Sequence, residues 1–302
     1  MKNLLSLESL TAAEMEKVVA LGAKLKALRG TGDARRHRPL EGQTWAMIFT
    51  KASTRTRVSF EVGVRELGGN VFFLNPNDAQ LGRGEPIKDT ARVFGRIAHG
   101  AIIRTFAQAD VEEFARYSDL PTINALTDEE HPCQVLADLL TIQELAGGWK
   151  NRRIVFMGDG DNNMARSWMW AAERLGFDLT IAAPEKYQPK AGYLARFSSG
   201  RIRCEADPAR AVKDADVLYT DVFVSMGQEA EGALRLEELR EYRIDSRLVS
   251  LAAPKALVMH CLPAYRGKEI TEEVLEEHAG TIFQQAENRL HAQKAVMSLI
   301  AR

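Results

Sequence analysis

The chain has 302 residues, of which 45% are hydrophobic and 27% charged, and its formal net charge is −1. This length exceeds one ordinary hydrophobic core and predicts two domains of about 150 residues each. The near-neutral charge gives no long-range attraction to nucleic acid or an anionic membrane, and no apolar run approaches the ~20 residues that span a bilayer. Residues 1–10 lack the pattern of a secretion signal, and three widely spaced cysteines form no disulfide framework, which favours a cytoplasmic location.

The predicted elements begin with a helix over 11–28, opened by a capping box from Thr11 to Glu14. Short apolar strands then alternate with amphipathic helices: strands at 44–49, 71–74, 101–105 and 122–125, helices at 54–67, 87–98, 110–117 and 131–145. After a break at Gly147-Gly148 the alternation resumes, with strands at 153–157, 179–182, 201–204, 217–221 and 257–261 and helices at 162–175 and 287–300. The pattern predicts an α/β fold of two doubly wound domains, each a mostly parallel sheet flanked by helices. We expect domains at 1–146 and 147–286, with helix 287–302 crossing back to pack on the first.

Polar residues follow the carboxyl ends of the predicted strands, where ligands bind in sheets of this kind. The first group is Ser53-Thr54-Arg55-Thr56-Arg57, between a strand and a helix. Helix N-termini present unpaired N–H groups and a positive dipole end, and an arginine fork matches two phosphate oxygens. This turn therefore predicts a site for a phosphate-sized dianion. The alternative is a serine that caps the helix beside arginines on a solvated face.

Further candidates stand at other strand and helix ends, each with a structural alternative. Arg104 ends a buried strand, where a structural ion pair is the alternative role. His131 and Gln134 flank a helix start, where His131 can polarise a carbonyl or merely cap the helix. Asp221 ends a later strand and suits the ammonium group of an amino acid, with a loop cap as the alternative. Cys261 ends another strand, where it could be a nucleophile, a weak hydrogen-bond partner or inert filler.

Two cofactor readings are disfavoured. A zinc site built from His131, Cys133, His260 and Cys261 would need adjacent residues on one tetrahedral ion, and no Cys-x-x-Cys is present. The loop that starts Gly158-Asp159-Gly160 resembles a dinucleotide loop, but the third glycine is replaced by Asn163 and the acidic residues would repel a pyrophosphate. We therefore expect no metal and no organic cofactor.

Taken together, these segments resemble the aspartate/ornithine carbamoyltransferase family, and its ornithine branch in particular. The resemblance is carried over nearly the whole chain by Ser53–Arg57, Asp89–Arg92, Arg104–Phe106, His131–Gln134, Asn162-Asn163, Asp221, Ser225–Gly227, His260–Pro263 and Gln285–Arg289, in the family's order. It implies that carbamoyl phosphate is bound by Ser53, Thr54, Arg55, Thr56, Gln80, Arg104, His131, Gln134, Cys261, Leu262 and Arg289. Ornithine would be bound by Asn163, Asp221, Ser225 and Met226. The implied catalytic residues are Arg55, Arg104, His131, Asp221 and Cys261.

The resemblance further implies transfer of the carbamoyl group from carbamoyl phosphate to L-ornithine, giving citrulline and phosphate in arginine biosynthesis. It also implies a homotrimer, in which the loop 77–85 carries Gln80 into a neighbouring subunit's site. Thr50, Phe223 and Tyr265 depart from residues common in the family. They leave N-acylornithine or putrescine open as the acceptor, and a non-catalytic binding protein of the same fold is a further alternative.

Overall fold

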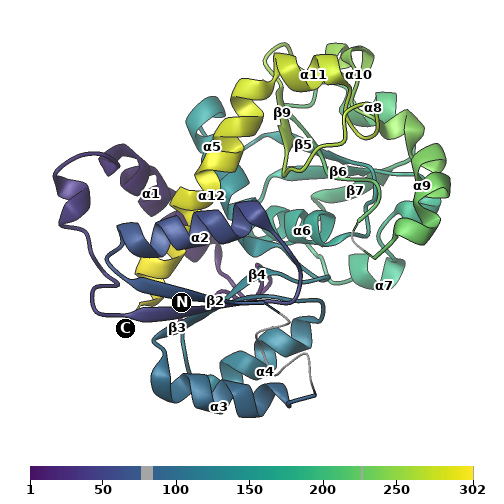
Figure 1. Cartoon of the computed structure of the whole chain (residues 1–302). Coiled ribbons are helices and arrows are strands. Elements are labelled where there is room, and N and C mark those ends of the chain that lie inside the picture. Colours follow the sequence, from purple (N-terminus) through teal and green to yellow (C-terminus); the bar gives the residue numbers. More distant parts are fainter. Residues whose placement is uncertain (76–83, 226, 302) are drawn as a thin grey trace. The chain divides into compact units, whose positions relative to one another are not determined.

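The computed structural model describes residues 1–75, 84–225 and 227–301, apart from the side chains of Arg35 and Glu229. The chain divides into two compact units, Met1–Leu140 with Glu287–Arg302 and Thr141–Ala286. The division falls at 140/141, inside a helix, whereas the sequence places a domain boundary at 146/147. Each unit is a parallel sheet flanked by helices, which confirms the predicted α/β class (Figure 1).

Unit 1 contains a four-stranded parallel sheet in the order β2-β1-β3-β4. Its strands are β1 (Thr44–Phe49), β2 (Asn70–Leu74), β3 (Gly100–Arg104) and β4 (Thr122–Leu126). Its helices are α1 (Ala12–Leu28), α2 (Thr54–Glu66), α3 (Ile87–Ile97), α4 (Gln108–Ser118) and the first part of α5 (Pro132–Ala146), with a short 3-10 helix η1 (Asp33–Arg35).

Helices cover both faces of this sheet. Helices α3 and α4 cover one face (Figure 1), where the buried side chains of Ile48 and Ile103 pack with Val111 and Phe114 of α4. Helix α2 lies on the other face, with Phe60 and other apolar residues buried. The order places β1 and β3 side by side at the centre, so that the residues following both strands lie at one edge of the sheet.

Unit 2 contains a five-stranded parallel sheet in the order β7-β6-β5-β8-β9. Its strands are β5 (Arg153–Met157), β6 (Asp178–Ala182), β7 (Ile202–Glu205), β8 (Val217–Thr220) and β9 (Leu257–His260). Its helices are α6 (Asn163–Leu175), α7 (Ala191–Leu194), α8 (Pro208–Val212), α9 (Gly232–Glu238), α10 (Ser246–Leu251) and α11 (Glu272–Glu277), with 3-10 helices η3 (Glu185–Tyr187), η4 (Glu229–Glu231) and η5 (Arg240–Tyr242). Helix α6 lies on one face, where Trp168 packs against Phe177 and Tyr219, and α8 and α10 lie on the other (Figure 1).

The last helix is longer than its sequence pattern indicates. Helix α12 runs Ala279–Ile300, so the predicted start at 287 is wrong and Gln285–Arg289 lies inside the helix rather than before it. Buried polar residues explain the error, because Gln285, Asn288 and Arg289 occupy core positions and interrupt the apolar periodicity. The predicted return to the first unit is confirmed: Asn288 accepts a hydrogen bond from Lys26 of α1, and Lys294 pairs with Glu66 of α2 at 2.7 Å.

The other predicted strands and long helices are present, with ends within one or two residues of the prediction. The capping box of α1 is present, with Thr11 Oγ1 accepting from Glu14 N–H. The short helices α7 to α11 have four to seven residues and the 3-10 helices three each, too few for apolar periodicity to distinguish them from loops.

Candidate active site

The turn between β1 and α2 has the form that the sequence predicts. Ser53 is the N-cap of α2, with extended backbone, and its Oγ accepts a hydrogen bond from the Thr56 N–H at 3.4 Å. Thr54 and Arg55 are exposed at the helix start, whereas Thr56 is buried. The turn therefore presents first-turn N–H groups and an exposed guanidinium in one place, an arrangement that attracts an anion.

Arg289 contacts the same turn from α12. Its side chain is only 5% exposed, and its Nη2 donates to Thr56 Oγ1 at 3.0 Å while Nη1 donates to Gln134 Oε1 at 2.6 Å. The amide nitrogen of Gln134 donates in turn to Asp138 Oδ1 at 2.8 Å, one turn further along α5. Both ends of the Gln134 amide are therefore held, which fixes its orientation.

Arg104 adds a further cation to this cluster in unit 1, and His131 lies near both arginines. Arg104 ends β3 and is 8% exposed, and its buried Nε has no hydrogen-bond partner among the residues described. Burial, with the nearby charges of Arg289 and Arg55, lowers the pKa of Arg104 to about 10, so it remains a cation at neutral pH. Burial and the charges of Arg289 and Arg104 lower the pKa of His131 well below its usual value, so its ring is neutral there. The mutual repulsion of these cations would be relieved by a phosphate-sized anion.

Asp221 and Cys261 meet at the edge of the second sheet. They follow β8 and β9, which pair in parallel with Thr220 opposite His260. The Cys261 Sγ–H donates to Asp221 Oδ1 at 2.9 Å, and the Asn162 amide donates to Asp221 Oδ2 at 3.5 Å. Burial raises the pKa of Asp221, while His260 and the hydrogen bond from Cys261 oppose the rise. The pair offers a carboxylate and a thiol to a ligand that carries an amine.

A buried histidine holds the segment after Cys261. His260 Nδ1 accepts from the Leu262 N–H at 2.9 Å, so the ring proton lies on Nε2, which donates to Glu269 Oε1 at 3.0 Å. Glu269 Oε1 also accepts from the Tyr265 N–H at 2.5 Å. His260 and Glu269 thus hold the Cys261–Tyr265 segment at both of its ends.

The remaining predicted residues have more varied surroundings. Asn163 is the first residue of α6 and its carbonyl accepts from Ser167 Oγ at 2.8 Å, while Ser225 forms a turn in which its N–H donates to Gln228 Oε1 at 3.0 Å. Leu262 is half-buried. Gln80 and Met226 lie outside the described residues, as does most of the loop 77–85 predicted to reach a neighbouring subunit.

Sequence reasoning missed three polar residues that support these clusters: Asn162, Asp138 and Glu269. Asn162 is the N-cap of α6 and its side-chain amide contacts Asp221. Asp138 stands four residues after Gln134 on a predicted helix, a spacing that brings side chains together. Glu269 had no local signal, because its contact with His260 depends on how the intervening loop folds.

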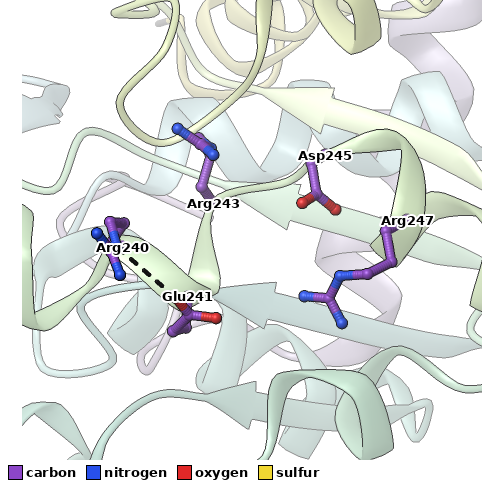
Figure 2. Close-up of a pocket in the computed structure, with 5 residues that line it drawn as sticks. All are labelled: Arg240, Glu241, Arg243, Asp245 and Arg247. Atoms are coloured by element: carbon purple, nitrogen blue, oxygen red, sulfur yellow. Dashed lines mark ion pairs between the residues drawn. The ribbon is translucent and has the colours of Figure 1, made fainter.

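Two hollows are lined by other residues. One, of about 680 Å³ in unit 1, is bordered by the ends of β1 to β3 and by α3 and α4, with Phe49, Leu74, Ile87 and Phe114 among its lining residues. The other, of about 550 Å³ in unit 2, is lined by Arg240, Glu241, Arg243, Asp245 and Arg247 (Figure 2). In this second hollow Glu241 pairs with Arg240 at 3.6 Å, and Asp245 accepts from the Leu248 N–H at 2.8 Å as the cap of α10.

The described part of the chain contains neither a cluster of metal ligands nor a helix that could span a membrane. Among residues 1–75, 84–225 and 227–301, no three His, Cys, Asp or Glu side chains gather in a way that could hold a metal ion. None of the helices described is long and apolar enough to cross a bilayer.

The fold and the two clusters define a two-unit α/β protein. Unit 1 carries a cluster of cationic side chains that suits an anion, and unit 2 carries a carboxylate–thiol pair. Residues 2–144 match the carbamoyl-P binding domain of the aspartate/ornithine carbamoyltransferases, and residues 150–300 match their Asp/Orn binding domain. The chain belongs to the aspartate/ornithine carbamoyltransferase family.

Individual relatives match over nearly their full length. The chain is 58% identical to an ornithine carbamoyltransferase of Akkermansia muciniphila, covering 100% of this chain and 98% of that protein. Its structure is similar to that of an ornithine carbamoyltransferase from Pyrococcus furiosus, with a TM-score of 0.91 and 45% identity, covering 99% of this chain and 97% of that one. An anabolic ornithine carbamoyltransferase from Campylobacter jejuni gives a TM-score of 0.92 at 41% identity, covering 99% of each chain.

Proposed function

We propose that this protein is an ornithine carbamoyltransferase, which transfers the carbamoyl group of carbamoyl phosphate to the side-chain amine of L-ornithine and yields L-citrulline and phosphate. The observation that carries the proposal is the cluster in unit 1, where Arg289 joins Thr56 to Gln134 beside Arg104 and His131. The identity to relatives named for this activity supports ornithine as the acceptor.

In this proposal unit 1 holds the phosphate and polarises the carbonyl. The turn Ser53–Thr56, with Arg55 and Arg289, binds the phosphate and stabilises it as it leaves. Arg104 and the neutral His131 donate hydrogen bonds to the oxyanion that develops when the amine attacks the carbonyl carbon. Gln134, held between Arg289 and Asp138, orients the carbamoyl amide.

Unit 2 would hold ornithine and place its amine. Asp221, Asn163, Ser225 and Met226 bind the amino acid, and Cys261 and Leu262 lie beside the reacting groups. A free alkylamine has a pKa of about 10.4, so the attacking amine must lose a proton on binding. Attack forms a tetrahedral intermediate, whose C–O bond then breaks to release phosphate. Carbamoyl phosphate is already activated, so the reaction requires no metal or organic cofactor.

Further parts of the proposal follow from the family resemblance. Residues 1–146 with 287–302 form the carbamoyl-phosphate domain, and residues 147–286 form the ornithine domain. The protein acts in the cytoplasm in arginine biosynthesis. It assembles as a homotrimer in which Gln80 completes a neighbouring site and thereby contacts carbamoyl phosphate.

An assay of carbamoyl transfer from carbamoyl phosphate to different acceptors tests whether ornithine is the substrate. Ornithine, N-acetylornithine, putrescine and aspartate are supplied separately, and the carbamoylated product and released phosphate are both measured. A clear preference for ornithine is expected. Preference for putrescine or N-acetylornithine would keep the role of unit 1 and overturn that of unit 2, and inactivity with all four would refute the proposal.

A further inference from the structure

A buried arginine lies behind the loop that carries Ser225. Arg235 belongs to α9, and its side chain is only 7% exposed. Its Nε donates to the backbone carbonyl of Phe223 at 2.9 Å, and its Nη2 donates to Asp159 Oδ2. Asp159 is also 7% exposed, so the two charges neutralise each other out of contact with water.

These contacts join Phe223 and Arg235, at the two ends of the loop that carries Ser225, and attach both to Asp159. Phe223 follows β8 and Asp159 follows β5, which are neighbouring strands with Met157 opposite Thr220. Arg235 lies beyond the loop, twelve residues after Phe223. One guanidinium therefore closes the stretch 224–234 at its base and attaches both of its ends to the edge of the second sheet.

The surroundings leave Phe223 and Arg235 little freedom. Phe223 is 1% exposed, and a Cβ on Gly158 would lie 2.8 Å from its Cε1 atom. The Arg235 guanidinium lies over the Tyr187 ring at 4.8 Å. Tyr187 in turn donates through its hydroxyl to Glu238, on the same helix as Arg235.

The chemistry of this contact requires arginine. Nε and Nη2 point in fixed directions from one planar group, so they can bond a carbonyl and a carboxylate at the same time. A lysine ammonium is a single point charge on a flexible stem and would keep the ion pair without fixing the carbonyl. An apolar side chain would leave Asp159 buried without its counter-ion, and the Phe223 carbonyl without its donor.

We propose that Arg235 is a positioning residue for ornithine: by tying Phe223 to Asp159 it holds the loop that presents Ser225, although it does not itself contact the substrate. The inference rests on the proposed function, because it takes the loop to be the amino-acid pocket. A loop already held in its binding conformation loses less conformational entropy when ligand arrives. Unit 1 has no part in this contact, so the effect is specific to ornithine.

The test compares Arg235→Lys, Arg235→Met and Asp159→Asn with Arg240→Met as the matched control. Arg240 is an exposed arginine just after α9 that pairs with Glu237 and, as Figure 2 shows, with Glu241. Steady-state kinetics are measured for each substrate in turn. Arg235→Met should raise the ornithine KM roughly 10- to 100-fold, or about 1.4–2.8 kcal/mol. The KM for carbamoyl phosphate should stay within about twofold.

The variants should also rank in a defined order. In ornithine KM, Arg235→Lys should lie between wild type and Arg235→Met, and Arg240→Met should match wild type. The double variant of Arg235→Met with Asp159→Asn should raise this KM by much less than the product of the two single increases, because both changes break one contact. An unchanged ornithine KM in Arg235→Met, or an equal loss for both substrates, would overturn the inference.

Hydrogen exchange separates this inference from the proposed function. Amides between Phe223 and Arg235 should exchange faster in Arg235→Met than in Arg240→Met, whichever acceptor the wild type uses. Inactivity of the wild type with ornithine would refute the proposed function alone. Unaltered exchange in Arg235→Met would refute the positioning role alone.

Discussion

Replacing Arg289 by methionine should separate anion binding from folding. In the absence of ligand, the change removes two charge-assisted hydrogen bonds, to Thr56 Oγ1 at 3.0 Å and Gln134 Oε1 at 2.6 Å. Each is worth about 1.5–3 kcal/mol. The change also removes a positive charge that repels Arg104. Together with burial, which is the larger cause, that charge lowers the pKa of Arg104 to about 10. Loss of bonds and relief of repulsion oppose each other, so we expect a net destabilisation of only about 1–3 kcal/mol.

The effect on ligand-induced stabilisation should be much larger. A ligand at 100 times its Kd stabilises the folded state by about 2.7 kcal/mol. For a unit of this size that raises Tm by roughly 5–11 °C, at about 2–4 °C per kcal/mol. Losing about 3 kcal/mol of anion affinity brings the same ligand concentration below the Kd of the variant. Its Tm should then rise by about 1 °C or less.

Thermal unfolding with and without a non-hydrolysable phosphonate analogue of carbamoyl phosphate measures both quantities. Lys294→Met is the matched control, because Lys294 is also a buried cation of α12 and pairs with Glu66 of α2 at 2.7 Å. The control should lower the Tm without ligand and keep the full ligand-induced rise. A ligand-induced rise in Arg289→Met as large as that of wild type would refute the assignment of Arg289 to the anion site.

Three further predictions concern the two sites and the pH dependence of stability. Arg55→Ala should cripple turnover and weaken carbamoyl phosphate binding, whereas Asp221→Ala should chiefly damage the use of ornithine; equal, mild effects in substrate-specific kinetics would contradict the division of roles. Gly158 has φ of +118° and no room for a Cβ beside Phe223, so Gly158→Ala should cost about 2–4 kcal/mol in denaturant unfolding, against about 1–2 kcal/mol for Gly147→Ala, where φ is +74° and no atom lies within 4 Å. Because burial lowers the pKa of His131 well below 6.5, the unfolded chain binds a proton below that pH that the folded chain does not. The contribution of His131 to the free energy of unfolding is thus fully present above pH 6.5. It is lost as pH falls below that value, by about 1.4 kcal/mol per pH unit. Unfolding curves for wild type and His131→Asn should differ in that slope, and parallel slopes would contradict the buried, neutral ring.

Local patterns were sufficient to predict the strand ends and helix starts that matter most here. The helix predicted from 54 begins there, with Ser53 as its N-cap, and β1 has the predicted limits, because apolar runs and capping residues are encoded within a few positions. The start of α12 was not predicted, because buried polar side chains such as Gln285 and Asn288 pair with distant groups and look like loop residues in sequence.

Arg235 illustrates the same limit at the candidate site. In Gly232–Glu238 the surrounding residues read as a short surface helix, and only the fold brings its guanidinium under Phe223 and Asp159. Glu269 is similar, since it is identified by the histidine it contacts rather than by its own neighbours in sequence. Candidate residues such as Asp221 and Cys261 can be anticipated because they stand at strand ends, whereas a supporting residue such as Arg235 is identified only by its contacts in the fold.

The two units position their candidate ligands by different physical means. In unit 1 the central groups, Thr56, Gln134 and Arg289, stand on three helices and bond one another directly, so the cationic site depends on helix packing. In unit 2 the groups stand on loops after strands, and each loop is held by a buried polar pair: His260 with Glu269 after β9, and Arg235 with Asp159 after β8. A buried pair that loses one partner leaves an uncompensated polar group, so damage to either pair should shift its loop before it unfolds the sheet. Substitutions at Arg235 or Asp159 are therefore expected to weaken ornithine use while carbamoyl phosphate binding persists.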